Sequence, residues 1–546
     1  MTDQSLVGEP VATTRAPAQD TLYGSLVRAS DGVPGTKRAL AGLRNGDEWV
    51  ELSYDELMTD VTTVSNHLHS LGLRRGDVLC LLLPNWTEAA IYTYAASRLG
   101  AIVCPITTIY RQRELSFILR RTECQIIVVP SVYRGFDYAA MVSEMAGELP
   151  DLQHIICVGG TATQNVLSSR EVLGSTSAHV EPPATSVDDI AVLAFTSGTT
   201  GESKGVMHSH ASMHAAIDDF VGHAGYGTGL TSLVMSPFGH LTGFTWGILM
   251  PLRGAGDVVL LEMWNPSEAL DLVARYSVTF TMGATPFLSD ILDAADSRPG
   301  AAFPDVFICA GAPIPPSLID RAVRSHDCRV VSGWGMSEYP IGTSTSVGDD
   351  SLLASACDGR PAGRAEILIV DHSGHPLEVG QEGDLLIRGP GLFRGYYKRP
   401  DLDAEAFTPD GRLKTGDRAR VLDPRGHIRI CGRTKDIIIR GGENIPVVEI
   451  ENILLTHPAI KEIALVPLPH ERLGEIACAC IVVSNDDSAD PTVADLAEFL
   501  GTHGVAKQFY PESVRVMPGF ARTPSGKIQK FLLREQVLSQ APDTDG

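Results

Sequence analysis

A loop that can wrap around phosphate groups is the most informative feature of this sequence. Residues 196–205 read TSGTTGESKG and follow a short apolar run, so the loop begins where a buried strand is expected to end. Glycines let the chain turn and bring backbone N–H groups close to an anion, while hydroxyl groups and the Lys204 ammonium add contacts. The spacing differs from the Walker motif, because no glycine immediately precedes Lys204. The sequence predicts a phosphate-binding loop, with an ordinary polar loop as the alternative. Its assigned residues are Thr196, Ser197, Gly198, Thr199, Thr200, Gly201 and Lys204.

Later segments supply the other groups that a bound nucleotide needs. Trp334, in GWGMSE at residues 333–338, offers a flat ring for a base, and Glu338 offers a carboxylate for a divalent metal ion. Asp417 follows a glycine turn in LKTGDRA, where a carboxylate can accept two hydrogen bonds from ribose hydroxyls. Lys527 is presented from the loop RTPSGKIQK, with an ordinary solvated lysine as the alternative. Together these groups predict a site for Mg²⁺ and a nucleotide.

Several histidines and one tryptophan permit two interpretations. His208, His210 and His214 could suggest a metal cluster, but no carboxylate or cysteine with ligand spacing accompanies them, so we do not expect one. His240, in SPFGHLTGF, fits either the mouth of a substrate pocket or an ordinary turn. Trp246, six residues further on, fits either a pocket wall or the core. We leave both alternatives open.

The elements that must position these groups form an α/β pattern up to about residue 360. A βαβ unit is expected, with a strand at 78–83, a helix at 87–99 and a strand at 101–104. The alternation predicts parallel sheets covered by helices, with ligands at the carboxyl ends of the strands. Further strands are expected at residues 126–129, 155–158, 258–261, 278–282, 306–309 and 329–331.

The pattern of the chain changes twice after this α/β part. Residues 360–434 read as strands joined by turns such as HSGH and DPRG, which predicts a small β-rich subdomain. From residue 435 onward strands and helices are mixed. We therefore expect residues 1–20 to be disordered, residues 21–434 to form an N-terminal domain, and residues 435–546 to form a small, mobile α+β C-terminal domain.

Composition narrows the function classes. The net charge of −22 argues against a nucleic-acid-binding surface. No apolar stretch approaches the roughly 20 residues needed to span a bilayer. The ten cysteines are scattered, and the closest pair, Cys478 and Cys480, is expected to form neither a disulfide nor a metal site. These features favour a cytoplasmic protein.

The ordered motifs resemble those of the adenylate-forming enzymes, a superfamily that includes acyl-CoA synthetases, aryl-CoA ligases, peptide-synthetase adenylation domains and luciferases. The resemblance extends from about residue 40 to residue 536 and rests on TSGTTGESKG, AGAP at 310–313, GWGMSE, KTGD, GRTKD with RGGEN, and PSGK. Within the superfamily, RGGENIPVVEIEN and SGKIQKFLLR look most like ligases for medium-chain or alicyclic acids, such as cyclohexanecarboxylate-CoA ligase. The resemblance to the superfamily implies a large N-terminal domain of two helix-covered β-sheet subdomains and a β-rich subdomain, followed by a mobile C-terminal domain.

The resemblance also implies a role for each matching position. Thr196, Lys204, Glu338 and Lys527 would be catalytic, and Glu338 and Thr199 would hold Mg²⁺. The nucleotide would contact the phosphate loop together with Gly311, Ala312, Pro313, Trp334, Gly335, Met336, Ser337, Asp417, Arg433, Asn444 and Lys527. The acid would contact Gly333, His240, Thr242 and Trp246, and CoA would contact Gly441, Gly442 and Glu443. Lys435 would be the hinge of the C-terminal domain.

The expected function is ligation of a medium-sized, aliphatic or alicyclic carboxylic acid to coenzyme A, with ATP as co-substrate and an acyl-adenylate as intermediate. Two alternatives stay open: an adenylating enzyme that loads a carrier protein in trans, and a nucleotide-binding homologue without turnover. The sequence also leaves a homodimer open.

Overall fold

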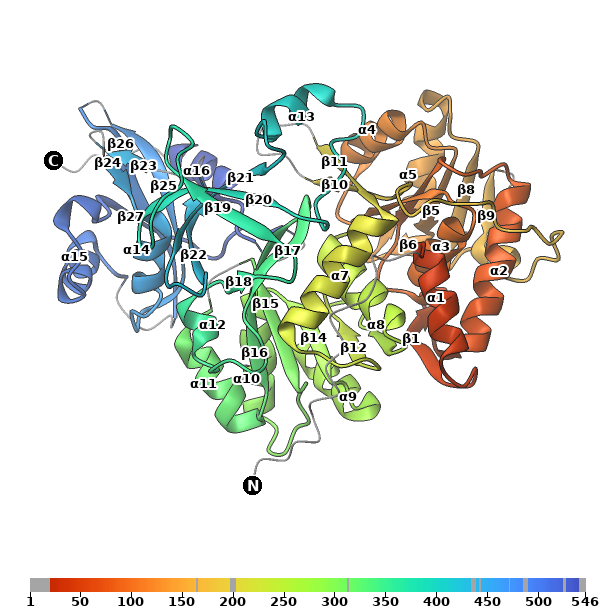
Figure 1. Ribbon diagram of the computed structural model, residues 1–546, viewed down its shortest axis with the longest axis horizontal. Helices are drawn as coiled ribbons and strands as arrows, with labels where there is room; N and C mark the ends of the chain where they lie inside the picture. Colours follow the sequence, from red (N-terminus) through yellow and green to blue (C-terminus); the bar gives the residue numbers. More distant parts are fainter. Residues whose placement is uncertain are drawn as a thin grey trace.

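The computed structural model describes residues 20–163, 165–196, 203–311, 314–433, 438–440, 443–470, 472–484, 490–523 and 527–539 (Figure 1). The expected disordered segment at the N-terminus lies outside these ranges up to residue 19. The chain forms a large N-terminal domain and a small C-terminal domain, the latter at the left of Figure 1.

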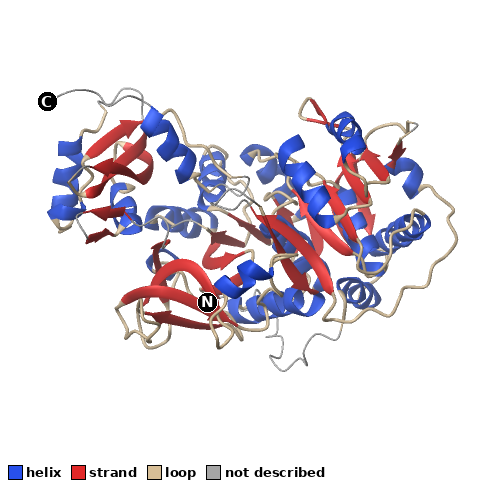
Figure 2. Cartoon of the chain, turned by 90° about the horizontal axis from the view of Figure 1, so that it is seen from above, coloured by secondary structure: helices blue, strands red, loops and turns tan. Residues whose placement is uncertain are grey.

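Two large sheets, each mostly parallel, form the frame of the N-terminal domain (Figures 1 and 2). The nine-stranded sheet runs in the order β18 (Arg360–Pro361), β17 (Tyr339–Ser344), β16 (Arg329–Met336), β15 (Val306–Ala310), β14 (Phe280–Gly283), β12 (Thr231–Val234), β13 (Asp257–Leu260), β1 (Arg38–Arg44) and β2 (Glu48–Ser53). The seven-stranded sheet runs in the order β11 (Lys204–Ser209), β10 (Ile190–Thr196), β4 (Ile102–Ile106), β3 (Val78–Leu82), β5 (Ile126–Pro130), β8 (His154–Val158) and β9 (Val166–Ser168).

Helices cover these sheets, as the alternating sequence pattern predicts. They are α1 (Leu22–Asp31), α2 (Tyr54–Ser70), α3 (Thr87–Arg98), α4 (Gln112–Thr122), α5 (Tyr138–Met145), α6 (Ser169–Leu173), α7 (His210–Ala224), α8 (Met250–Arg253), α9 (Pro266–Tyr276), α10 (Thr285–Asp296), α11 (Pro316–His326) and α12 (Leu353–Ala356). Several begin with a capping residue; Ser53, for example, forms a capping box with Glu56 at the start of α2. Strands β3, β4 and β5 are buried along their whole length, which explains why they read as continuous apolar runs.

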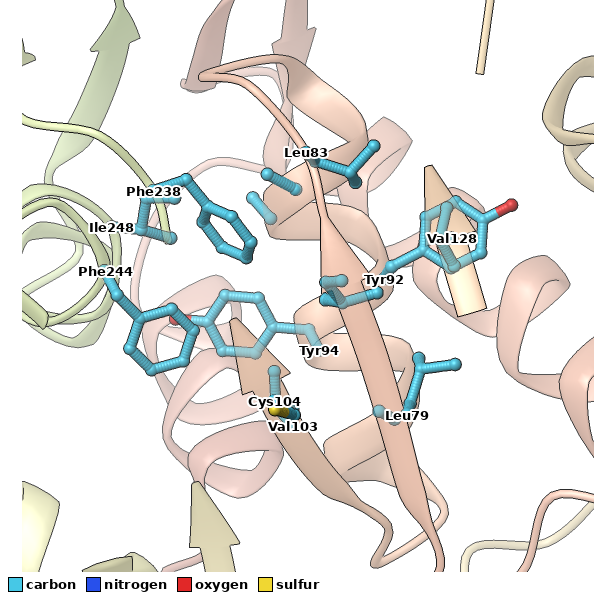
Figure 3. Close-up of a cluster of buried hydrophobic side chains, with 14 of the residues drawn as sticks. Leu79, Leu83, Tyr92, Tyr94, Val103, Cys104, Val128, Phe238, Phe244 and Ile248 are labelled. Carbon is cyan, nitrogen blue, oxygen red and sulfur yellow. The ribbon is translucent and has the colours of Figure 1, made fainter. Parts of the chain in front are cut away.

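One hydrophobic core links the two large sheets. The rings of Tyr94, from α3, and of Phe238 and Phe244 point toward one another beside β4 (Figure 3). Phe238 and Phe244 pack edge to face with centroids 5.7 Å apart. Phe244 belongs to a π-helix, Thr242–Leu249, a conformation that is rare and often found at functional sites.

The antiparallel edges of the large sheets were not part of the sequence-based expectation of parallel sheets. β10 and β11 form a hairpin, and so do β16 and β17. Both connections are too short for a parallel crossover, which needs a dozen or more residues. These two hairpins carry the phosphate loop and the Ser337–Glu338 turn, respectively.

The remaining parts are a β-rich sheet and the C-terminal domain. The β-rich sheet is antiparallel in the order β19 (Glu366–Val370), β20 (Glu382–Arg388), β21 (Leu413–Val421) and β22 (Ile428–Arg433), with α13 (Pro400–Ala406) beside it. The C-terminal sheet contains β24 (Glu443–Ile445), β23 (Ile438–Arg440), β26 (Gly474–Val483), β25 (Ile460–His470) and β27 (Ser513–Val516). Its helices are α14 (Val447–Leu454), α15 (Val493–Thr502) and α16 (Lys530–Ser539).

The C-terminal sheet is covered on both faces. Helices α14 and α15 pack on one face, whereas α16 packs on the other through Leu533 and Val537. Cys478 and Cys480 lie two residues apart on β26 and therefore share the face under α16. All ten cysteines are free thiols.

Candidate active site

The site is built where the edges of the two large sheets approach each other. The Ser337–Glu338 turn joins β16 to β17 at one edge, and β11 begins directly after the phosphate loop at the other. The buried imidazole of His208, on β11, donates from Nε2 to the carbonyl oxygen of Ser337 over 2.8 Å. This hydrogen bond links the two hairpins.

A segment of the chain from much later in the sequence ties the same two hairpins together. We call residues 393–398, FRGYYK, the strap. Its Phe393 N–H donates to the Glu338 carbonyl oxygen over 2.9 Å, and its Tyr397 N–H donates to the Gly205 carbonyl oxygen over 2.8 Å. Arg394 pairs through its backbone with Met207. The strap therefore fixes the phosphate-loop strand against the turn that presents Glu338.

Glu338 and Lys204 meet the same tyrosine of the strap. The Tyr396 hydroxyl donates to Glu338 Oε1 over 2.8 Å, and Lys204 Nζ lies 5.1 Å from the centre of the Tyr396 ring. Glu338 is 8% exposed and Tyr396 is 6% exposed. Burial and the Glu338 charge raise the pKa of Tyr396, so its hydroxyl stays a donor. Tyr396 is not among the residues that the sequence motifs indicate, although the paired tyrosines in GYYK are a visible signal.

Asp417, predicted to hold the ribose, receives two donors in this structure. Trp334 Nε1 donates to Oδ2 over 2.9 Å, and Arg433 Nε donates to Oδ1 over 3.0 Å. Both of these partners were also assigned to the nucleotide site. Trp334 is largely buried, and a Cβ at Gly342 would lie 2.6 Å from its ring, so only glycine leaves room for the indole there. Trp334 thus orients the Asp417 carboxylate, a contact separate from the base-stacking role that the sequence predicts for its ring.

Lys527 reaches this site from the C-terminal domain. A Cβ on Gly311 would lie 2.7 Å from Lys527 Cε and 3.4 Å from Nζ, so the lysine lies against the glycine of the AGAP motif. Residue Lys527 as a whole is exposed, but its ammonium end is buried, and this burial lowers its pKa. The charge of Arg433 lowers the pKa further. Asp417 and Glu338 act in the opposite direction. The structure therefore brings the predicted lysine, both carboxylates and Arg433 together from both domains.

His240 lies at the start of the π-helix, close to Lys527. Its Nδ1 accepts a hydrogen bond from the Thr242 N–H over 3.2 Å, which places the proton of the neutral ring on Nε2. Burial lowers the pKa of His240 to about 4, and the charge of Lys527 adds to the effect. The ring is therefore neutral at pH 7 and can donate from Nε2.

The remaining residues assigned to the acid, Trp246 and Gly333, and two assigned to the nucleotide, Gly335 and Met336, lie in the core or in β16. Trp246 is only 2% exposed and packs edge to face on Phe220, with centroids 4.9 Å apart. Gly333 and Gly335 lie in β16, and both are closely covered, because a Cβ would meet Ile341 and Pro340 respectively. Met336, at the end of β16, is half-buried.

Part of the predicted site lies outside the described residues. This holds for the phosphate-loop residues Ser197, Gly198, Thr199, Thr200 and Gly201, for Ala312 and Pro313, for the hinge Lys435, and for Gly441 and Gly442. The backbones of Glu443 and Asn444 form β24, whereas their side chains lie outside the described part. Thr196, the last residue of β10, pairs with Lys204 across the phosphate-loop hairpin.

Of the three histidines that follow the loop, His208 and His210 form hydrogen bonds within the fold, whereas the ring nitrogens of the buried His214 have no hydrogen-bond partner among the described residues. His210 Nδ1 accepts the Leu22 N–H over 3.0 Å, and burial lowers the pKa values of both His208 and His210 to about 4. Burial also lowers the pKa of His214 well below its usual value. In the described part of the chain, no group of three or more His, Cys, Asp or Glu residues is arranged to hold a metal ion. Nor is any described helix long and apolar enough to cross a membrane.

Comparison with known proteins assigns both domains to one kind of enzyme. Residues 27–397 match the family of AMP-binding enzymes, and residues 449–527 match the AMP-binding enzyme C-terminal domain. A medium-chain fatty-acid–CoA ligase of Escherichia coli is 32% identical, over 89% of this chain and 86% of the ligase. A 2-hydroxy-7-methoxy-5-methyl-1-naphthoate–CoA ligase of Streptomyces carzinostaticus is also 32% identical, over 89% and 88% of the two chains.

Among solved structures, MatB from Rhodopseudomonas palustris is similar in two states. The ATP-bound form superposes with a TM-score of 0.83 at 25% identity, covering 95% of this chain and 99% of MatB. The apo form superposes with a TM-score of 0.73 at the same identity, covering 96% and 99%.

Proposed function

The chain belongs to the family of AMP-binding enzymes and is an AMP-forming acid–thiol ligase, and from this premise we propose that it activates a medium-sized aliphatic or alicyclic carboxylic acid. ATP and CoA are its co-substrates. The observation that supports the proposal most strongly is the meeting of Lys527, Glu338, Asp417 and Arg433 at the junction of the two domains. A nucleotide and an acid held there would have a cation, a metal ligand and a ribose acceptor within reach.

In the first half-reaction the carboxylate attacks the α-phosphorus of ATP and pyrophosphate leaves. The protein acts by positioning and by stabilising charge. Lys204 and the phosphate loop would hold the β- and γ-phosphates. Lys527 would neutralise the charge shared by carboxylate, α-phosphate and leaving group. His240 would donate from Nε2 to the acid, which the neutral tautomer permits.

Mg²⁺ fits the residues present at Glu338. Its Oε1 accepts from Tyr396, whereas Oε2 accepts no hydrogen bond from the described residues and so stays available to a cation. Oxygen ligands are those that Mg²⁺ prefers, together with substrate phosphates. Glu338 would hold the ion, with Thr199 as the second proposed ligand, and the ion would neutralise charge on the phosphates.

In the second half-reaction the CoA thiol attacks the acyl carbon and AMP leaves. After adenylate formation, Lys527 still occupies the site that the thiol must reach. We therefore propose that the C-terminal domain rotates about Lys435 and brings Gly441, Gly442 and Glu443 to the thiol. The higher similarity to ATP-bound MatB than to apo MatB supports the view that the present arrangement is the adenylating one.

Three observations support a medium-sized, non-aromatic acid. The RGGENIPVVEIEN and SGKIQKFLLR segments resemble ligases for such acids, and the similar Escherichia coli protein is a medium-chain fatty-acid–CoA ligase. The segment after His240 is an apolar π-helix, TGFTWGIL, suited to an aliphatic chain.

A panel of acids tests this function. The purified protein is given ATP, Mg²⁺, CoA and one of hexanoate, octanoate, decanoate, cyclohexanecarboxylate, benzoate or hexadecanoate; pyrophosphate and thioester are measured. We expect both products to be highest with hexanoate to decanoate or cyclohexanecarboxylate. A preference for benzoate would contradict the proposed acid. Pyrophosphate release that yields product only with an added carrier protein would identify a carrier-loading enzyme. ATP binding without pyrophosphate release from any acid would identify a non-catalytic homologue.

A further inference from the structure

Tyr396 lies between two groups that the nucleotide needs at the same time. Its hydroxyl donates to Glu338 Oε1 over 2.8 Å, while the face of its ring lies 5.1 Å from Lys204 Nζ. Glu338 comes from the edge hairpin of one large sheet and Lys204 from that of the other. The Tyr396 side chain therefore contacts both Glu338 and Lys204 and links one large sheet to the other.

Tyr396 is anchored by its backbone and by its ring. Its N–H donates to Asp403 Oδ1 over 2.7 Å, and its ring packs edge to face on Phe393 at 4.9 Å. Tyr396 also forms a β-bridge with Val206, two residues after Lys204. A donor of this kind fixes Oε1 of Glu338, whereas Oε2 accepts no hydrogen bond from the residues that the structure describes.

We propose that Tyr396 is a positioning residue that sets Glu338 and Lys204 at the separation required to bind Mg·ATP. The inference rests on the proposed function, because it gives Glu338 a metal ion and Lys204 a phosphate to hold. The hydroxyl positions Glu338, the proposed metal ligand, and the ring positions Lys204, the proposed phosphate ligand. The two contributions can therefore be removed one at a time.

The test compares Tyr396→Phe, Tyr396→Leu and the matched control Tyr397→Phe in the full-length protein. Tyr397 is the neighbouring tyrosine of the strap, and its ring lies beside Lys398 instead of Lys204. Binding of ATP is measured by isothermal titration calorimetry with Mg²⁺ and, separately, with EDTA. Pyrophosphate release gives the KM for ATP and for the acid, and thermal unfolding reports folding.

Each variant has a distinct expected result. Tyr396→Phe should bind Mg·ATP roughly tenfold more weakly, equivalent to about 1.4 kcal/mol, and should bind metal-free ATP as the wild type does. Tyr396→Leu should weaken ATP binding with and without Mg²⁺, because it removes the aromatic ring against which the Lys204 ammonium lies. Tyr397→Phe should match the wild type, and the KM for the acid should stay unchanged in Tyr396→Phe.

Two results with Tyr396→Phe would overturn the inference. The first is that this variant binds Mg·ATP as tightly as the wild type. The second is that it loses equal affinity for ATP with and without Mg²⁺, which would show a merely structural effect. A wild-type protein that binds Mg·ATP but releases no pyrophosphate from any acid would refute the proposed function alone, since the binding comparison still reads out Tyr396. Failure of the wild type to bind ATP at all would refute both.

Discussion

At the scale of single residues, the site depends on donors that orient carboxylates before any ligand arrives. Asp417 is held by Trp334 and Arg433, and Glu338 is held by Tyr396. A carboxylate fixed in this way loses little freedom when it meets the ligand, which raises affinity. We therefore expect the donors to affect binding even where they do not touch the substrate.

Replacing Trp334 with phenylalanine tests this orienting role. The variant keeps a flat ring but removes the N–H that donates to Asp417, and a hydrogen bond to a charged group contributes about 1.5–3 kcal/mol. We expect the KM for ATP to rise roughly tenfold or more, with kcat changed little. Trp264→Phe is the control, because it removes a similar indole–aspartate bond, to Asp290, at an exposed position. Equal effects of the two substitutions on KM would contradict the orienting role.

Trp246 poses a different question, because it lies in the core and beside the proposed acid site. Its contact with Phe220 and its 2% exposure predict that Trp246→Ala lowers the free energy of unfolding by about 3–5 kcal/mol. Chemical denaturation measures this loss. The acid panel should be repeated with the variant, since a shift toward longer acids would show that Trp246 also bounds the acyl pocket. A stability within about 0.5 kcal/mol of the wild type would contradict its packing role.

At the scale of elements, the β11–α7 segment joins the phosphate loop to the core through buried, neutral histidines. His208 donates to the Ser337 carbonyl and His210 accepts from Leu22. Burial lowers the pKa values of both to about 4, below the unfolded value of about 6.5. Between pH 6.5 and 4 the unfolded chain takes up protons that the folded chain excludes. The resulting stability is complete above pH 6.5 and is lost as the pH falls toward 4.

His210→Asn tests this link between burial and pH. Asparagine can still accept from the Leu22 N–H, but it cannot take up a proton. The slope of unfolding free energy against pH should decrease by about 1.4 kcal/mol per pH unit within the window from 6.5 to 4. Denaturant unfolding at pH 7.5 and pH 5 measures the slope. His372→Asn, at an exposed turn, is the matched control. An unaltered slope in His210→Asn would show that this histidine is not the group excluded from protonation.

At the scale of the whole molecule, one site is shared by two domains that must serve two reactions. Lys527 lies against Gly311 only because the C-terminal domain lies against the N-terminal domain in this arrangement. The charges of Asp417 and Glu338 favour the protonated Lys527 in this arrangement, whereas that of Arg433 opposes it. This arrangement suits a domain that rotates between half-reactions.

Lys527→Ala separates the two half-reactions. Loss of one preorganised charge typically slows a reaction by ~10²–10³, or about 3–4 kcal/mol, so adenylate formation from ATP and acid should fall by this factor. The same variant should still convert a supplied acyl-adenylate and CoA into thioester, which chromatography measures. If thioester formation fell as far as adenylate formation, rotation of the domain away from the site would not be part of the mechanism.

The sequence by itself determined the α/β class and the family, and it predicted which groups form the site. Loops rich in Gly, Ser and Thr, and the order of the motifs, are local features, and a strand buried on both faces shows itself as an apolar run. The sequence also marked Lys527, Asp417 and Glu338 without any knowledge of their neighbours.

Only the tertiary structure decided which groups touch one another. The strap lies nearly 190 residues after the phosphate loop, and no local pattern shows that Tyr396 meets both Lys204 and Glu338. The same holds for the Trp334–Asp417 hydrogen bond and for the place of Trp246 in the core. Such contacts depend on how sheets and domains pack, and packing joins residues through space without leaving a period or a motif in the chain.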